Sequence, residues 1–234
     1  MTKEQFIDEL KKININLTSY QLEQFDKYFK VLVEWNEKMN LTSITEEEEV
    51  YEKHFYDCLL VSQSYDFNNQ KICDVGAGAG FPSVPLKIVY PDLDITIVDS
   101  LDKRIKFLNV LSDELNLDNF KAVSQRAEEF AQDNREAYDL VLARAVARLN
   151  ILVELCLPLV KVDGYFVALK GKQALEELDE AKLGIEKLGA NLISKDKYQL
   201  ISDYSTRYML KYKKVKPTDK KYPRNYSQIK KKPL

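Results

Sequence analysis

The sequence predicts an α/β fold in which a mostly parallel sheet follows a helical N-terminal segment. Three observations lead to this prediction. From about residue 70 onward, short apolar runs alternate with amphipathic stretches, which is typical of βαβ units and so of a parallel sheet. The first of these runs leads directly into a glycine-rich turn, and the segment before it carries an apolar stripe at helical spacing.

The N-terminal segment, residues 1–66, is expected to form a helical subdomain. Large apolar side chains recur there at spacings of three and four residues, namely Phe25, Tyr28, Phe29, Leu32 and Trp35. A stripe of this kind lies on one face of a helix, so we expect it to pack into a core. The acidic run Glu46–Glu49 is expected to be an exposed helix start with Thr45 as its N-cap. A second helical stretch is expected over residues 50–62.

Seven strands are predicted for the rest of the chain. Five short apolar runs are expected to be the parallel strands, at residues 71–75, 95–98, 120–123, 138–142 and 165–169. Because these runs are apolar almost throughout, the sheet is expected to be covered on both faces. The connecting helices are expected at about residues 83–90, 101–116, 145–160 and 172–188. Residues 191–201 and 206–215 are predicted to add an antiparallel pair at the sheet edge.

Composition is that of an ordinary globular protein and argues against several function classes. Of 234 residues, 45% are apolar and 31% charged. No apolar run approaches the ~20 residues that cross a bilayer, and acidic residues interrupt the start of the chain, so we expect a cytoplasmic protein. Cys58, Cys73 and Cys156 form no C-x-x-C pair, and His54 is the single histidine. No metal site is therefore expected.

Charge is unevenly distributed along the chain. Residues 211–234 hold ten basic residues and one acid, whereas the preceding 210 residues hold 25 basic and 36 acidic residues. An acidic body with a basic end suggests that the end contacts a polyanion, although a solvated tail that only aids solubility has the same composition. Residues 217–234 are expected to be an irregular basic tail.

The strongest local signal is the glycine-rich turn Asp74–Pro82, which follows a predicted strand and precedes a predicted helix. A nucleotide-binding loop requires this context. Glycines such as Gly76 and Gly78 let the backbone turn tightly and approach a ligand closely. Asp99 ends the next predicted strand, 23 residues after Gly76, where an acid can accept hydrogen bonds from both hydroxyl groups of a ribose.

These features fit both NAD and S-adenosylmethionine, and two details favour S-adenosylmethionine. The glycine spacing is G-x-G-x-G rather than G-x-G-x-x-G, and Asp74 stands two residues before Gly76. A carboxylate there would repel a pyrophosphate at the following helix N-terminus, whereas it suits an ammonium and a sulfonium group. The alternative is that Asp74 is a structural acid that accepts hydrogen bonds from the amides of its own loop.

The full set of motifs resembles the glucose-inhibited division protein B family, bacterial methyltransferases that modify N7 of a guanine in small-subunit ribosomal RNA. In order along the chain, the motifs are Trp35-Asn36-x-x-x-Asn40-Leu41-Thr42, His54-x-x-Asp57, Asp74-Val75-Gly76-x-Gly78-x-Gly80-Phe81-Pro82, Asp99-Ser100-x-x-Lys103-Arg104, Arg126-x-Glu128-Glu129, Arg144-Ala145 and Leu169-Lys170-Gly171. The resemblance extends from about residue 15 to Tyr222-Pro223-Arg224. The chain departs from it at Lys53 and Cys58, where members often have Arg and Ser, and at Asn225, often Gly, which leaves the tail conformation open.

The resemblance implies a Rossmann-like S-adenosylmethionine-dependent methyltransferase fold over residues 67–216, with 16S ribosomal RNA of the small ribosomal subunit as the partner. It implies cofactor contacts for Gly76, Phe81 and Arg144, and for Ala127 and Glu128 as the pair that meets the adenine end, in addition to Asp74, Gly78 and Asp99, which are argued above. It also places a further group near the same pocket, namely His54, Asp57, Lys103, Arg104 and Lys170. We expect Arg144 and Lys170 to act at the pocket edge or towards the RNA, and we expect a monomer.

The expected chemistry requires placement rather than proton transfer. Guanine N7 carries an in-plane lone pair and attacks a sulfonium methyl group without deprotonation, so the enzyme must align the reactants. We therefore expect His54 to be hydrogen-bonded to Asp57, one helical turn away, rather than to act as a general base.

The tail offers groups that could pair with RNA phosphates or stack on bases, namely Lys213, Lys214, Lys216, Lys220, Lys221, Lys230, Lys231, Lys232, Tyr212, Tyr222 and Tyr226. Three alternatives remain for the function as a whole. The chain could be a methyltransferase of a small molecule or protein, a non-catalytic nucleotide- or RNA-binding protein, or a NAD oxidoreductase, since one fold serves many functions.

Overall fold

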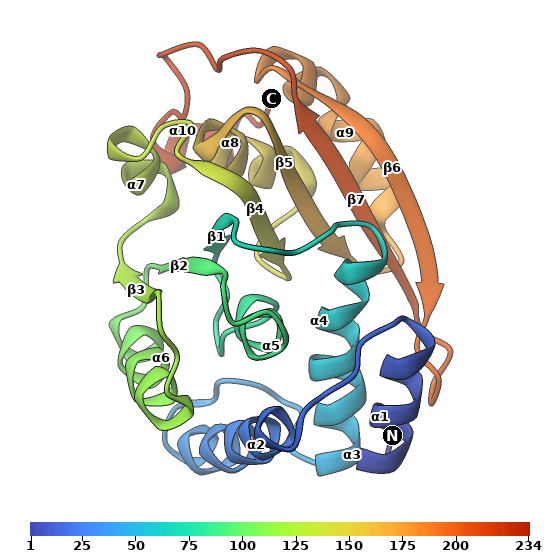
Figure 1. Ribbon diagram of the computed structural model, residues 1–234. Coiled ribbons are helices and arrows are strands. Elements are labelled where there is room, and N and C mark those ends of the chain that lie inside the picture. The colour runs from blue at the N-terminus through green and yellow to red at the C-terminus, as the bar shows by residue number, and fades with distance from the viewer.

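Seven strands form one sheet in the computed structural model, which describes residues 1–234 (Figure 1). The strands are β1 (Lys71–Val75), β2 (Asp94–Asp99), β3 (Phe120–Ser124), β4 (Tyr138–Arg144), β5 (Val160–Lys170), β6 (Ala190–Gln199) and β7 (Thr206–Lys214). Their order is β3-β2-β1-β4-β5-β7-β6. The first five strands pair in parallel, and β7 runs antiparallel to both β5 and β6. The predicted mostly parallel sheet with an antiparallel edge pair is therefore confirmed.

Helices connect the strands and precede them. They are α1 (Lys3–Lys12), α2 (Ser19–Met39), α3 (Glu47–Val50), a π-helix η1 (Tyr51–Tyr56), α4 (Asp57–Leu59), 3₁₀-helices η2 (Leu60–Gln63) and η3 (Leu157–Leu159), α5 (Ser83–Val89), α6 (Asp102–Leu115), α7 (Ala127–Asp133), α8 (Leu149–Cys156), α9 (Ala174–Lys187) and α10 (Tyr226–Lys231). Helix α7 was not predicted, because seven residues are too few to display a helical period. The role expected for Thr45 was wrong, since the N-cap of α3 is Glu46, without a side-chain hydrogen bond.

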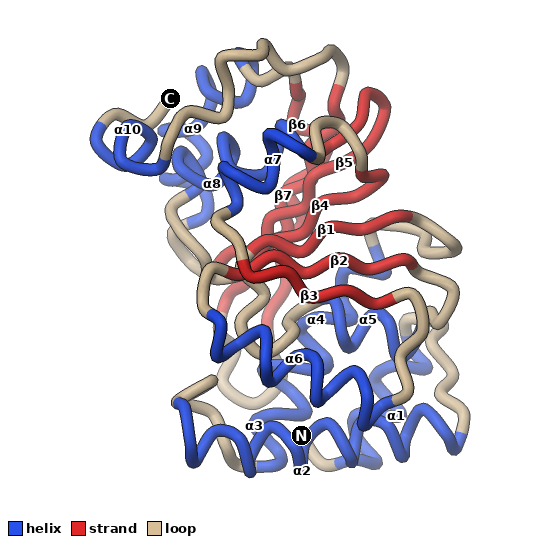
Figure 2. The backbone as a smooth tube through the Cα atoms, turned by 90° about the vertical axis from the view of Figure 1, so that its left-hand side faces the viewer, coloured by secondary structure: helices blue, strands red, loops and turns tan.

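The sheet separates two hydrophobic cores, as its apolar strands predict. Helices α1 to α6 lie on one face, and α7 to α10 lie on the other (Figure 2). Along one strand, alternate residues enter different cores: Ile95 and Ile97 belong to the first, whereas Val98 belongs to the second. This division follows from the two-residue side-chain period of a strand.

The N-terminal helices form part of the first core. The predicted stripe on α2 buries Phe25, Tyr28 and Leu32 completely. The hydroxyl of Tyr28 also donates a hydrogen bond of 2.5 Å to the carbonyl oxygen of Ala79 in the glycine-rich turn. The helical segment thus holds that turn in place as well as filling the core.

Residues 217–234 differ from the irregular tail expected from their composition. The segment contains α10, which packs against α8, and the side chain of Ile229 is fully buried. Two groups assigned above to a possible RNA-contacting surface, Tyr212 and Lys214, are also fully buried. The ammonium of Lys214 donates to the carbonyl oxygens of Leu157 and Val160, so that assignment was wrong for both residues.

Candidate functional site

Three cavities adjoin at the carboxyl ends of β1, β2 and β4. The Asp99 cavity, about 260 Å³, is lined by Val75, Gly76, Val98, Asp99, Ser100, Arg104, Gln125, Arg126, Ala127, Glu128, Ala145, Val146, Leu155 and Tyr226. The glycine-loop cavity, about 200 Å³, is lined by Leu41, Thr42, His54, Gly76, Ala77, Gly78, Ala79, Phe81, Arg104, Arg144 and Ala145. The basic cavity, about 540 Å³, is lined by Ile44, Lys53, His54, Asp57, Arg144, Ala145, Val146, Ala147, Arg148, Leu169, Lys170, Gly171, Glu177, Tyr198 and Arg207.

Ala145 borders all three cavities. It directly follows β4 and has a φ of 56°, a left-handed conformation that is uncommon for alanine. Strained backbone of this kind persists where the surrounding structure enforces it, and it is enriched at functional sites. The next residue, Val146, packs so closely on Gly76 that a Cβ atom there would lie 2.8 Å from its Cγ2. The turn after β4 and the glycine-rich turn therefore fit together as one wall.

Asp99 is held at the end of β2 with its carboxylate facing the Asp99 cavity. It is nearly fully buried. Its Oδ1 accepts the N–H of Leu101 at 3.0 Å, and its Oδ2 accepts the N–H of Gly78 at 3.3 Å and a guanidinium hydrogen of Arg104 at 3.0 Å. These bonds orient an anionic acceptor beside the glycine-rich turn, where the sequence analysis expects a ribose.

Asp74 lies beneath the turn and lines none of the three cavities. Its side chain is fully buried; Oδ2 accepts the N–H of Ser83 at 3.1 Å, and Oδ1 has no hydrogen-bond partner. Burial raises the pKa of this carboxyl to about 7. The contact with Ser83 is with the first amide of α5, directly after the glycine-rich turn, and it is of the structural kind considered for Asp74 above.

Arg144, at the end of β4, connects the sheet to the N-terminal subdomain. Its guanidinium donates to Nδ1 of His54 and to Oδ2 of Asp57, each at 3.0 Å, and to the carbonyl oxygen of Lys53 at 3.1 Å. All three acceptors lie on η1 or at its end; π-turns often occur at functional sites. The guanidinium also lies 4.9 Å from the ring centre of Phe81, within cation–π range.

The expected hydrogen bond between His54 and Asp57 does not form. Instead, Arg144 donates hydrogen bonds to both side chains. Burial and the charge of Arg144 lower the pKa of His54 to about 3. The neutral ring accepts at Nδ1 and therefore donates from Nε2 to the hydroxyl oxygen of Thr42, 2.9 Å away. With both nitrogens engaged, His54 has no free lone pair with which to accept a proton.

Lys170, another predicted site residue, lines the basic cavity, and its ammonium forms an ion pair. Its ammonium lies 2.6 Å from Oε2 of Glu177 and donates to the carbonyl oxygen of Ala147. Lys103, which the resemblance also placed near the pocket, is exposed on α6 and lines none of the three cavities.

Three residues that border the basic cavity were not predicted, namely Arg148, Tyr198 and Arg207. Tyr226, which was considered a possible RNA-stacking residue, lines the Asp99 cavity instead. Tyr198 and Arg207 lie on the antiparallel edge pair, and the hydroxyl of Tyr198 donates to Oδ1 of Asp57 at 3.1 Å. Their distance along the chain from the glycine-rich turn gave no local signal of this proximity.

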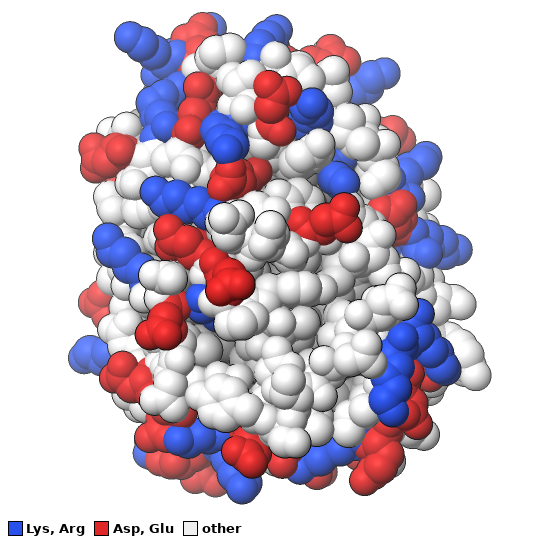
Figure 3. All heavy atoms as spheres, viewed as in Figure 1, with Lys and Arg blue, Asp and Glu red and all other residues white.

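The side chains that line the basic cavity include more cationic than acidic groups. On the face shown in Figure 3, lysine and arginine side chains are interspersed with acidic ones around a largely uncharged middle. The basic cavity instead gathers five cationic side chains, Lys53, Arg144, Arg148, Lys170 and Arg207, with two acids, Asp57 and Glu177. An excess of positive charge in a concave site favours an anionic ligand.

The first two cavities fit S-adenosylmethionine. The Asp99 carboxylate is placed to accept hydrogen bonds from ribose hydroxyls, and Ala127 and Glu128 line the far end of the same cavity. The glycine-loop cavity continues from it past Gly76 and Gly78, whose missing side chains leave backbone accessible. The two adjoining cavities are therefore lined by Asp99, Gly76, Gly78, Phe81, Ala127, Glu128 and Arg144, whereas Asp74 lines neither of them.

Comparison with known proteins identifies the family. The model of rRNA small subunit methyltransferase G matches residues 21–199. The chain is 54% identical over 236 residues to the ribosomal RNA small subunit methyltransferase G of Staphylococcus aureus strain Newman, covering 100% of this chain and 99% of the relative. The protein of the same name from the bovine strain RF122 is 55% identical, with the same coverage.

Solved structures show the same fold at low sequence identity. The TYW2 protein of M. jannaschii in complex with AdoMet superposes with a TM-score of 0.58 at 14% identity, covering 74% of this chain and 80% of that one. A mutant form of a 16S rRNA (adenine(1408)-N(1))-methyltransferase from Catenulisporales acidiphilia gives 0.55 at 15% identity, covering 70% and 93%.

These matches confirm the Rossmann-like fold, the S-adenosylmethionine cofactor and the methyltransferase activity predicted from the sequence. They also confirm the substrate class: the chain is an enzyme that methylates ribosomal RNA of the small subunit. No helix of the structure is both long and apolar enough to cross a membrane. With its glycine-rich turn, its Asp99 carboxylate and a full-length match of this kind, the chain belongs to the rRNA small subunit methyltransferase G family.

Proposed function

We propose that this chain transfers the methyl group of S-adenosylmethionine to N7 of a guanine in 16S ribosomal RNA, with the guanine in the basic cavity. The observation that carries the proposal is that Ala145 borders all three cavities. A cofactor in the Asp99 and glycine-loop cavities and a base in the basic cavity would therefore meet at this residue. When bound, S-adenosylmethionine supplies an electrophilic methyl group.

The protein's part in the reaction is to align and desolvate the reactants. Guanine N7 needs no base, and His54 cannot serve as one because its pKa lies near 3 and both its nitrogens are engaged. His54 is instead a positioning residue that fixes Arg144, and Asp57 holds the guanidinium from the other side. Alignment of reacting atoms at near-attack distance can account for much of a rate enhancement.

Arg144 and Lys170 are proposed to border the bound base and to act in catalysis. Both line the basic cavity, and each is restrained by a carboxylate, Asp57 for Arg144 and Glu177 for Lys170. Methylation at N7 gives the base a positive charge, so a neighbouring acid would stabilise the product. Arg148 and Arg207, which are less buried, would contact the phosphate backbone without reading its sequence.

The helical residues 1–66 and the domain over residues 67–216 are proposed to form this site together. Thr42 and His54 from the first border the same cavity as Gly76 and Arg144 from the second. We further propose that the enzyme acts as a monomer in the cytoplasm, where ribosomal subunits are available to it, since one chain supplies every wall of the three cavities.

The proposal is tested by transfer of a labelled methyl group from S-adenosylmethionine. Naked 16S ribosomal RNA, mature small subunits and an unrelated RNA are incubated in parallel, and the labelled nucleoside is identified. We expect 7-methylguanine at one ribosomal position and no label in the unrelated RNA. Label on another atom or base would refute the N7 assignment. Binding of S-adenosylhomocysteine without label on either ribosomal substrate would refute the proposed reaction on those two substrates and leave the cofactor placement intact.

A further inference from the structure

Tyr226, on the C-terminal helix α10, lines the Asp99 cavity together with Asp99 and Glu128. The ring is half-buried. The guanidinium of Arg126 lies 4.4 Å from its centre, and Nε of Arg126 donates to Oε1 of Glu128 at 2.7 Å. A single chain of contacts thus connects the C-terminal segment to the residue pair proposed to meet the adenine.

The segment that carries Tyr226 is fastened to α8 by a buried ion pair. Glu154 is fully buried. Its carboxylate accepts hydrogen bonds from the backbone N–H of Arg224 and from two nitrogens of the Arg224 guanidinium, and the shortest N–O distance is 2.6 Å. Ile229 enters the second core, and Asn225 caps α10 through the N–H of Gln228. Tyr226 therefore faces the cavity from a segment anchored on both sides of it.

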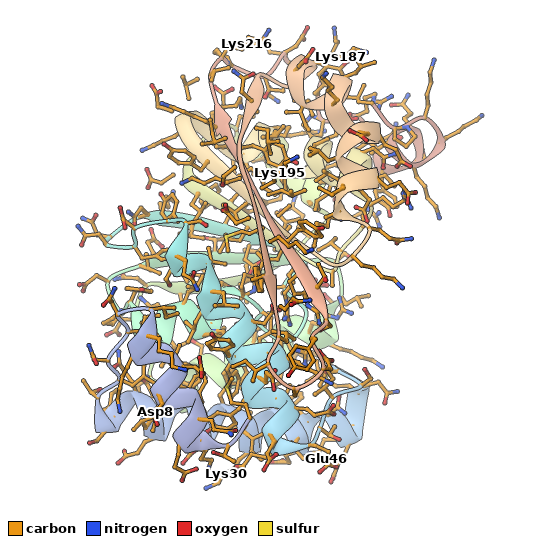
Figure 4. All side chains as sticks on the ribbon, turned by 90° about the vertical axis from the view of Figure 1, so that its right-hand side faces the viewer. Asp8, Lys30, Glu46, Lys187, Lys195 and Lys216 are labelled. Atoms are coloured by element: carbon orange, nitrogen blue, oxygen red, sulfur yellow. The ribbon has the colours of Figure 1, made fainter.

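Tyr226 lies far along the chain from the other residues that line the Asp99 cavity, and the path of the chain brings it there. Lys216, just after β7, lies at the end of the molecule opposite Glu46 and the N-terminal helices (Figure 4). From there residues 217–225 return past the loop between α7 and β4 and along α8, which places α10 beside α7 and α8 (Figures 1 and 2). The carbonyl oxygens of Thr218 and Tyr222 accept hydrogen bonds from Arg135 along this return.

We propose that Tyr226 is a cofactor-contacting residue that forms a wall for the adenine of S-adenosylmethionine. This inference rests on the cofactor placement of the proposed function. An aromatic ring offers a flat apolar surface to a nucleobase, and a stacked guanidinium restrains that ring. The C-terminal segment accordingly belongs to the cofactor site through Tyr226, while the lysines that follow face solvent.

Calorimetric titration of S-adenosylhomocysteine into four forms of the full chain tests the contact. Compared with the unmodified chain, Tyr226→Ala is expected to bind about tenfold more weakly, a typical loss for removal of an aromatic partner of a base. Tyr226→Phe keeps the ring and should bind within about twofold, as should the control Lys230→Ala on the exposed side of α10. The affinity for 5′-methylthioadenosine, which lacks the amino-acid end, should fall by the same factor in Tyr226→Ala.

The possible results of these titrations have different consequences. Equal binding by Tyr226→Ala and the unmodified chain would overturn the inference and leave the proposed function intact. Failure of the unmodified chain to bind S-adenosylhomocysteine would instead refute the cofactor placement itself. A loss for S-adenosylhomocysteine without a matching loss for methylthioadenosine would exclude an adenine contact.

Hydrogen exchange on the unmodified chain tests the same contact without relying on a variant. Saturating S-adenosylhomocysteine is expected to slow exchange of the backbone amides of residues 226–231, since the ligand would favour the docked segment. The amides of α1, remote from the cavity, are the internal control. Unchanged exchange in α10 alongside protection of the glycine-rich turn would contradict the contact of Tyr226 with the cofactor.

Discussion

Arg144 donates a hydrogen bond to Nδ1 of His54 across 90 positions of the chain, at a distance of 3.0 Å. The same guanidinium pairs with Asp57, so one residue at the end of β4 fixes two residues of the N-terminal subdomain. The bond also determines the tautomer of His54, with its proton on Nε2. The proposed base-binding cavity thus depends on contacts between segments that are far apart in sequence.

Replacing Arg144 with Met should destabilise the protein and lower activity. The variant leaves Asp57 buried without its closest cation, and loss of one partner of a buried pair costs about 3 kcal/mol or more. Arg148→Met is the matched control, because Arg148 is exposed and pairs with exposed acids; its cost should stay below about 1 kcal/mol. Urea unfolding measures both. Equal stability of the two variants would contradict the importance of the buried pair.

Kinetics on the same two variants distinguish their roles. Arg144→Met should lower kcat, since it disturbs the position at which cofactor and base meet, whereas Arg148→Met should mainly raise KM for RNA. A change in KM alone for Arg144→Met would place that residue in RNA binding only.

The stability of the cofactor-free protein should depend on pH through Asp74. Its pKa is raised from 3.8 to about 7 in the folded state, so the folded form holds the proton more tightly. The resulting stability is fully present below pH 4 and is lost as the pH rises through 7. Asp74→Asn should not show this loss. The free energy of unfolding of this variant, measured with urea, should therefore increase relative to that of the unmodified chain between pH 5.5 and 8.5. A constant difference would show that Asp74 keeps an ordinary pKa.

His54 contributes with the opposite sign, and its substitution is a control for the first measurement. Its pKa is lowered from 6.5 to about 3, so stability is present above pH 6.5 and is lost as the pH falls towards 3. His54→Asn should weaken this decline at low pH without changing the behaviour above pH 7. A decline of the same size in His54→Asn would assign it to other groups.

Gly76→Ala should abolish measurable S-adenosylhomocysteine binding. The new Cβ would lie 2.8 Å from Val146, at a φ of 72° that alanine rarely adopts, and both effects distort the wall shared by two cavities. Gly171→Ala is the control, because a Cβ there meets nothing within 4 Å. Calorimetry on both variants measures the difference. Retained binding in Gly76→Ala would place the cofactor elsewhere.

The exposed lysines of the C-terminal segment should contribute to RNA affinity through charge alone. Simultaneous replacement of Lys230, Lys231 and Lys232 with Ala should reduce the slope of log affinity against log salt by about 2, near the value for three lost phosphate contacts. Affinity for S-adenosylhomocysteine should not change. An unaltered salt slope would assign these lysines to solubility. Truncation of the chain after Val215 is less informative, because it would also remove Ile229 and Tyr226.

Local sequence patterns predicted the strands well and the side-chain partners poorly. The runs at 71–75 and 138–142 lie within observed strands, since a strand buried on both faces needs apolar residues throughout. The tail was mispredicted because its composition is that of solvated segments, although Ile229 and Arg224 anchor it. Lys214 was misassigned for the same reason: a lysine is usually exposed, and only buried carbonyl acceptors identify the exception.

What the sequence by itself determined is the order of the elements, the glycine-rich turn, the acid at the end of the second strand and the family. These are local or colinear features, set by side-chain period, backbone freedom and spacing. The tertiary structure alone decided that Arg144 lies between His54 and Asp57 and that Tyr226 lines the same cavity as Asp99. Such contacts join residues about 90 or more positions apart, and no local pattern specifies which distant side chain will arrive at a strand end.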